Sequence, residues 1–297
     1  MNWLIPLDIG LIMGLIFSWV VLSLAIAFRL FNFPDLTIEG SFLLGAAVYA
    51  TLYKANFNIC LSIFVASIAG GLSGFLTALL HSRFKLNKFL AAIIVIAIIY
   101  SLSLRLMGAS NISLLKTKTL LDYLNRYLYC GFHVGIIGFL FLFVVFGLIF
   151  ISHLLSTKFG LRLRVSGSNP EYARSLGINV SISLIIGLFF TNCLAAFSGI
   201  LLAMYQGFVD VGMGQGTLIL ALAAMTIGER VLPESCFSFH NFVCLSAVVG
   251  SILYQLLVAY AVRFGLAPTD LKLVTALLVL MVVILRVSRD SELFADM

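Results

Sequence analysis

Few side chains in this 297-residue chain have the type and spacing that catalysis or metal binding requires. Neither the histidines nor the cysteines show HExxH or CxxC spacing, so we predict no metal site and no disulfide framework. The GxxxxGK(S/T) phosphate loop, the GxSxG nucleophile motif and clustered carboxylates are also missing. We therefore expect a chain that is not an enzyme, binds no cofactor and cannot hydrolyse ATP by itself. The four histidines and five cysteines are instead scattered along the chain, at His81, His133, His153 and His240 and at Cys60, Cys130, Cys193, Cys236 and Cys244.

The composition instead describes a membrane protein. Hydrophobic residues make up 62% of the chain and charged residues 10%, against roughly 25% charged residues in soluble domains. No run alternates like a β-strand, and several runs reach the ~20 apolar residues that a spanning helix needs. We therefore predict an all-α polytopic transmembrane helical bundle, formed as a single domain over residues 1–297. About nine spans are expected, near residues 9–29, 40–53, 57–80, 89–107, 130–155, 181–206, 215–229, 239–262 and 271–287.

The basic residues predict the orientation of this bundle. With the amino terminus outside, 11 of the 18 Lys and Arg residues lie on the inner face and 7 on the outer face, which is the sense of the positive-inside rule. The net charge of +6 is then explained by the basic loops of a membrane protein. We therefore expect the chain to lie in a lipid bilayer and to bind no nucleic acid. The first apolar run lacks a preceding positive region and a cleavage site, so it is predicted to remain as a span.

A polar segment, Lys158–Gly177, interrupts the apolar runs and has the pattern of a capped helix. Asn169 is a typical N-cap, Pro170 fits the first helical position, and Glu171 places negative charge in the first turn. Gly177 then suits the left-handed residue that ends many helices. The sequence therefore predicts a short helix with both of its ends specified.

This helix is more ordered than a connector between two spans needs to be, so we expect it to contact a partner. The basic residues of the segment place it on the inner face. Tyr172 and Leu176 are four residues apart on one helical face and would supply an apolar contact. Glu171 and Arg174 would then set the orientation of the partner.

Two polar hairpins, Phe31–Ala47 and Tyr205–Ala224, resemble each other. Each contains an aspartate, turn residues and then a run of small side chains. The predicted topology places them on opposite membrane faces, as in transporters with inverted repeats; the alternative is two ordinary glycine-rich loops. The residues expected to order the turns are Asp35, Glu39, Asp210 and Gly216. The residues expected to line a solute pathway are Ser41, Gly45, Ala46, Thr217, Ala221 and Ala224.

Glycines also recur at four-residue spacing, as in the pairs Gly10/Gly14 and Gly70/Gly74. Small residues let helices approach closely in lipid, where little hydrophobic drive acts between them. For each pair we expect tight packing inside the chain in preference to a dimer contact.

The expected spans contain few ionisable residues. In secondary transporters such residues mark ion or proton relays, whereas Asp35, Glu39 and Asp210 fall near predicted span ends. This weakens the alternative of a self-sufficient secondary transporter or channel and favours a pathway that is energised by another protein.

Three segments resemble a known family. VSGSNPEYARSLGINV (residues 165–180) is similar to the cytoplasmic segment of bacterial ABC-importer permeases of the branched-chain amino acid and ribose type. The runs Pro34–Ala47 and Met204–Glu229 resemble the subfamily that is paired with tryptophan- or tyrosine-type binding proteins. The resemblance covers most of Pro34–Leu285 and departs at Arg105–Arg126 and Phe237–Phe242. The matching positions of the first pattern are Arg164, Gly167, Asn169, Pro170, Ala173, Gly177, Ile178 and Asn179.

The resemblance implies the permease subunit of an ABC importer for a small solute, an amino acid or related compound, in the bacterial cytoplasmic membrane. A homodimer of permeases would form the pathway, with cytoplasmic ABC ATPase subunits and an extracytoplasmic substrate-binding protein as partners. The segment 158–180 would couple the permease to the ATPase. The coupling residues are then Arg164, Gly167, Asn169, Pro170, Glu171, Tyr172, Ala173, Arg174, Leu176 and Gly177.

Overall fold

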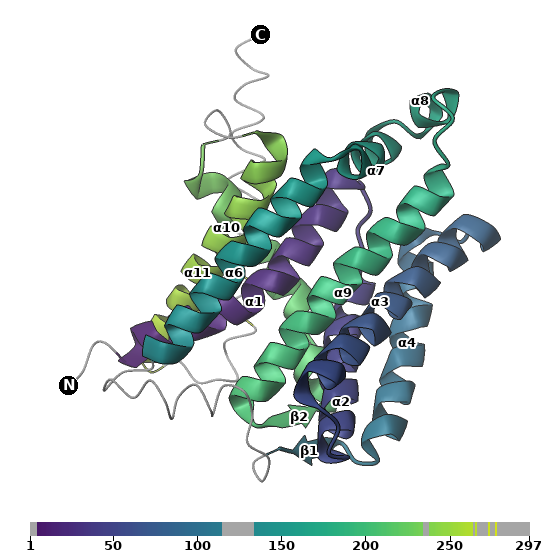
Figure 1. Ribbon diagram of the computed structural model, residues 1–297. Coiled ribbons are helices and arrows are strands. Elements are labelled where there is room, and N and C mark those ends of the chain that lie inside the picture. The colour runs from purple at the N-terminus through teal and green to yellow at the C-terminus, as the bar shows by residue number, and fades with distance from the viewer. Residues whose placement is uncertain are drawn as a thin grey trace.

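The computed structural model describes residues 5–114, 134–233 and 238–263, with the single residues 265, 273 and 277, and these form a helical bundle (Figure 1). The long helices are α1 (Ile5–Leu30), α2 (Thr37–Lys54), α3 (Ile59–Phe84), α4 (Lys88–Met107), α6 (Val134–Ser156), α9 (Val180–Gln206), α10 (Thr217–Val231) and α11 (Phe239–Arg263). The short elements are α7 (Lys158–Ser168), α8 (Pro170–Ser175), the 3-10 helix η1 (Val211–Gly214), β1 (Asn111–Ser113) and β2 (Phe208–Asp210).

The predicted spans match these long helices closely. Eight of the nine correspond to a helix, and the ninth, 271–287, falls almost wholly outside the described residues. Seven helices of the described chain are long and apolar enough to cross a membrane. The two spans expected to be short are α2, with 18 residues, and α10, with 15. An all-α polytopic bundle is therefore confirmed.

Helix α1 lies at the centre of the bundle and packs closely against α11. A Cβ atom on Gly14 would lie 2.7 Å from the Cα atom of Ile252, and one on Gly10 would lie 2.9 Å from the Leu256 side chain. Only glycine lets the two helices approach this far. The expectation of internal packing at this pair is confirmed.

The pair Gly70/Gly74 on α3 packs in the same way. Both glycines face α9, where Ala196 lies against Gly70 and the Asn192 side chain lies against Gly74. Helix α2 lies alongside these two helices and contacts both of them. Small residues therefore join α2, α3 and α9 into one closely packed group.

A short antiparallel ribbon, at the end of the bundle that is predicted to face outward, differs from the expectation of a chain without strands. Asn111 in β1 pairs with Asp210 in β2, and Ser113 pairs with Phe208. Each strand has three residues, which is too short for an alternating pattern to show in the sequence. The backbone pairing of β1 with β2 connects the loop after α4 to the hairpin after α9.

The opposite end of the bundle carries α7 and α8, beside the end of α1 (Figure 1). There Arg29 of α1 forms a two-pronged ion pair with Glu229 of α10, with Nε donating to Oε1 at 2.6 Å and Nη2 donating to Oε2. Such paired hydrogen bonds fix geometry as well as charge. They hold the end of α1 to the end of α10.

Candidate functional site

Helix α8 has both of the caps that its sequence predicts. The Oδ1 atom of Asn169 accepts a hydrogen bond from the backbone N–H of Tyr172 at 3.0 Å, and Pro170 occupies the first helical position. At the other end Gly177 has a φ of +75°. Its N–H donates to the carbonyl of Arg174, and the N–H of Ile178 donates to that of Ala173, both at 3.0 Å. These two bonds form a Schellman motif, which completes the helix end.

The polar segment holds a second helix, α7, that the expectation of one short helix missed. Asn169 ends α7 and also begins α8, with an extended backbone between the two. The inward side of α7 meets the bundle: a Cβ atom on Gly167 would press on the backbone of Leu30 and Phe31. The Arg164 guanidinium lies 5.1 Å from the centre of the Phe239 ring, within cation–π range. Both residues thus hold the segment to the bundle.

The other residues of α8 divide into a buried contact and an exposed surface. Ala173 is fully buried, whereas Glu171 and Arg174 are exposed. Tyr172 and Leu176 are each 56% exposed although both are large and apolar. One turn of helix separates them, so they form a small apolar patch on the surface of α8.

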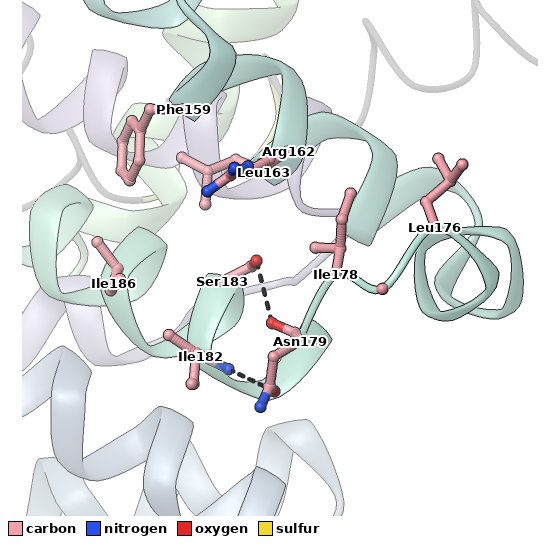
Figure 2. Close-up of a pocket in the computed structure, with 10 residues that line it drawn as sticks. Phe159, Arg162, Leu163, Leu176, Ile178, Asn179, Ile182, Ser183 and Ile186 are labelled. Atoms are coloured by element: carbon pink, nitrogen blue, oxygen red, sulfur yellow. Dashed lines mark hydrogen bonds between the residues drawn. The ribbon is translucent and has the colours of Figure 1, made fainter.

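A pocket of about 300 Å³ lies beside this patch, between α7 and the start of α9. Figure 2 shows Phe159, Arg162 and Leu163 on one side and Ile182 and Ile186 on the other, with Leu176 at the α8 edge. The start of α9 is fixed by Asn179, whose Oδ1 accepts from the N–H of Ile182 at 3.2 Å. The arrangement provides a recess with both apolar and polar walls beside an exposed, capped helix.

The two polar hairpins have the turn chemistry that the sequence predicts. Asp35 accepts from the N–H of Thr37 at 2.9 Å, and Asp210 accepts from the N–H of Gly212 at 2.7 Å. Glu39 was expected to order its own turn, but it contacts the other hairpin. Its Oε1 atom accepts from the N–H of Gly216 at 2.7 Å, so it joins the first hairpin to the second.

Asp35 lies deeper in the bundle than we expected. Its side chain is fully buried, and Oδ2 accepts from Nδ2 of Asn192 at 2.6 Å. Asn192 lies twelve residues into α9, about 18 Å along that helix. Asp35 does precede the start of α2 by two residues, but α2 begins inside the bundle, because the segment after α1 turns back into the bundle.

Asp35 belongs to a buried polar cluster that the sequence analysis did not predict, although one of its members, Ser41, was expected to line the solute pathway. Ser41 donates to Asn192 Oδ1 and bonds with Ser73, while the hydroxyl groups of Thr37 and Thr77 lie 2.7 Å apart. Two features of the sequence could have indicated the cluster. Ser73 and Thr77 are four residues apart in the apolar run of α3, and Asn192 lies in the apolar run of α9. The cluster satisfies groups that would be costly to leave unpaired away from water.

The six residues predicted to line the pathway are all buried within the single chain. A Cβ atom on Gly45 would lie 2.6 Å from the carbonyl oxygen of Ala196, so this glycine also sets the approach of α2 to α9. Ser41 is part of the polar cluster, and Thr217 donates to the carbonyl of Gly214 at 2.8 Å. Their assignment to the pathway stays a prediction.

Comparison with known proteins identifies the family. The sequence model of the branched-chain amino acid transport system permease component matches residues 7–284. The chain is 34% identical to the tyrosine transport system permease protein of Clostridioides difficile, over 90% of this chain and 86% of that protein. It is also 30% identical to the uncharacterized protein RP368 of Rickettsia prowazekii, over 94% of this chain and 96% of that protein.

A third relative is more distant. The autoinducer 2 import system permease protein LsrC of Escherichia coli is 28% identical over 62% of this chain and 52% of its own length. No solved structure matches the chain significantly. The family match spans nearly all of the described helices, so the chain belongs to the permease components of branched-chain amino acid transport systems and is a multi-pass ABC-importer subunit of the bacterial inner membrane.

Proposed function

We propose that α8 is the element through which a cytoplasmic ATPase drives this permease. The observation that carries the proposal is the exposed apolar pair Tyr172 and Leu176 on a helix with both ends capped. A surface of this kind is typical of a protein contact, and its flanking charges would fix the orientation of the partner. Asn169 and Gly177 make the helix rigid before it binds, which lowers the entropy lost on docking.

The partners follow from the same proposal. An ABC permease works with an ATPase inside and a substrate-binding protein outside. We infer that two copies of this chain form the pathway, that ATP hydrolysis belongs wholly to the partner, and that this subunit is not catalytic. The solute is an amino acid or a related compound, which is supported by the name of the tyrosine permease relative.

Replacing Leu176 by Asp tests the coupling role. Charge in an apolar contact would remove the burial of a leucine side chain, which stabilises a contact by about 1.5–3 kcal/mol. We expect uptake to fall about tenfold or more with the amount of inserted permease unchanged. Uptake of radiolabelled solute and co-purification of the ATPase are the measurements.

Leu161→Asp is the matched control, because Leu161 in α7 is 58% exposed and Leu176 is 56% exposed. It should retain ATPase binding and uptake. Normal uptake in Leu176→Asp would leave α8 as a purely structural helix.

The buried carboxyl group of Asp35 is the one observation that favours the alternative, an ion-coupled carrier, since such groups form ion relays in secondary transporters. Its oxygens are already engaged by Thr37 and Asn192, which supports a structural role. We therefore expect Asp35→Asn to lower the yield of folded protein but to keep uptake per folded molecule. Uptake per amount of detergent-stable permease distinguishes the two roles of Asp35. Complete loss of uptake at a normal yield of permease would favour the ion-coupled carrier.

A further inference from the structure

A second and larger pocket lies at the outer end of the bundle, away from α8. It has a volume of about 510 Å³ and is lined by α1, α11, the start of α10 and the end of α9. Cavities that hold small organic ligands have volumes of roughly 300–1,000 Å³ and mostly apolar walls. Nothing in the coupling proposal uses this pocket.

The mouth of the pocket is polar and its walls are apolar. Gln206 and Arg263, the last residues of α9 and α11, lie at the mouth with Pro6 near the start of α1. The walls deeper in include Met13 and Phe17. These helix ends lie at the end of the bundle that is predicted to face outward, where β2 follows α9, so we infer that the pocket opens toward that face.

One wall residue departs from this pattern. Gln255 lines the pocket and is only 6% exposed. Within the described part of the chain no hydrogen bond of its carboxamide is found, and its amide atoms are not among the fully buried atoms without a partner, so the carboxamide is accessible from the pocket. A carboxamide that faces a cavity can donate hydrogen bonds to a bound ligand and accept them from it. Gln255 therefore points to a ligand that brings a polar group into an apolar space.

The walls indicate the rest of that ligand. Phe17 presents an aromatic ring that is held in place by stacking on Phe42, with ring centres 5.8 Å apart. Aromatic and apolar groups pack well on such a surface. Gln255 and Arg263 are eight positions apart, about 12 Å along α11. This length suits a solute of amino-acid size, with charged groups at the mouth and its body inside.

We propose that this pocket is an outward-opening site for a small amphipathic solute, whose apolar or aromatic body lies on the Phe17 wall and whose polar group binds the Gln255 carboxamide. The proposal rests on the proposed function, since the ligand is the transported solute. A lipid acyl chain would fill the apolar walls but would leave Gln255 without a partner, so the solute fits better.

Thiol labelling tests whether the pocket opens to water, and it needs neither transport nor an ATPase. In a chain without its native cysteines, Val258→Cys in the pocket wall is compared with Leu257→Cys. Leu257 is 50% exposed but is not part of the pocket. A membrane-impermeant thiol reagent on intact cells should modify Val258→Cys about tenfold faster or more, because thiolates form in water. Equal rates, or reaction of Val258→Cys only after detergent extraction, would overturn the proposal, the latter by assigning the pocket to lipid.

Protection from labelling tests the ligand class, with L-tyrosine as the probe. Millimolar L-tyrosine should slow the modification of Val258→Cys, and glycine should not. Adding Gln255→Met should raise the half-protecting concentration about tenfold, whereas adding Leu257→Met should leave it unchanged. Absence of protection, or the same protection with Gln255→Met, would overturn the proposal. A wild-type transporter that shows protection without ATP-dependent uptake would instead contradict the proposed function alone.

Discussion

Single buried polar residues decide how the first hairpin is placed in this permease. The contact between Asp35 and Thr37 spans two residues, so turn chemistry in the sequence was enough to predict it. The contact between Asp35 and Asn192 spans 157 residues. No local pattern encodes such a pairing, and the depth of Asp35 therefore had to come from the structure.

Gly45 is the residue at which the packing of α2 against α9 can best be tested. A Cβ atom there would lie 2.6 Å from Ala196 O, a backbone atom that cannot move aside easily. We expect Gly45→Ala to destabilise the folded permease by about 1–3 kcal/mol, the usual range for overpacking. The melting temperature in detergent should fall accordingly.

Gly138→Ala in α6 is the control, because a Cβ atom at Gly138 would meet nothing within 4 Å. Removing a helical glycine should leave stability equal or raise it by about 0.5–1 kcal/mol. Equal melting temperatures for the two variants would mean that α2 does not need its close approach to α9.

Among the elements, the α7–α8 pair shows what capping signals can and cannot predict. Asn169, Pro170 and Gly177 specified both ends of α8 from residue type alone. Helix α7 lacks such a beginning, since Thr157 makes no side-chain cap bond. Its position depends on contacts of Gly167 and Arg164 with α1 and α11. Those contacts are tertiary, so the sequence did not reveal this helix.

Removing the N-cap should weaken coupling more than it weakens the fold. Asn169→Ala loses the bond to the Tyr172 N–H, which costs about 0.5–2 kcal/mol. A helix of six residues has little other local stability. We expect several-fold less solute transported per ATP hydrolysed, with a near-normal yield of permease, in reconstituted vesicles.

Asn169→Asp keeps an acceptor oxygen at the N-cap and should retain wild-type coupling. Full coupling in Asn169→Ala would show that the preformed order of α8 is not required for its role.

For the whole molecule, the connections between distant segments explain how one face could act on the other. The first hairpin follows α1 at one end of the bundle, and the second follows α9 at the opposite end (Figure 1). Glu39 joins them directly through Gly216, and α10 runs from that joint to the ion pair of Glu229 with Arg29. The inverted-repeat relation between the hairpins stays a prediction, but the two are in physical contact.

Hydrophobic runs predicted most of this architecture, because a spanning helix must be long and apolar whatever it packs against. The outer ribbon was missed, since three residues in Asn111–Ser113 carry no periodic signal. The pocket around Gln255 was missed as well. Its walls come from four helices that only the folded chain brings together.

Site-specific photo-crosslinking reports directly on the proposed contact between α8 of this permease and the ATPase. A photoreactive phenylalanine analogue would replace Tyr172 in the assembled transporter, with the same analogue at Phe64 of α3 as the control, since both side chains are exposed. Illumination should join position 172, and not position 64, to a subunit that carries a P-loop, identified by mass spectrometry. An intact transporter in which position 172 never crosslinks to that subunit would contradict the account.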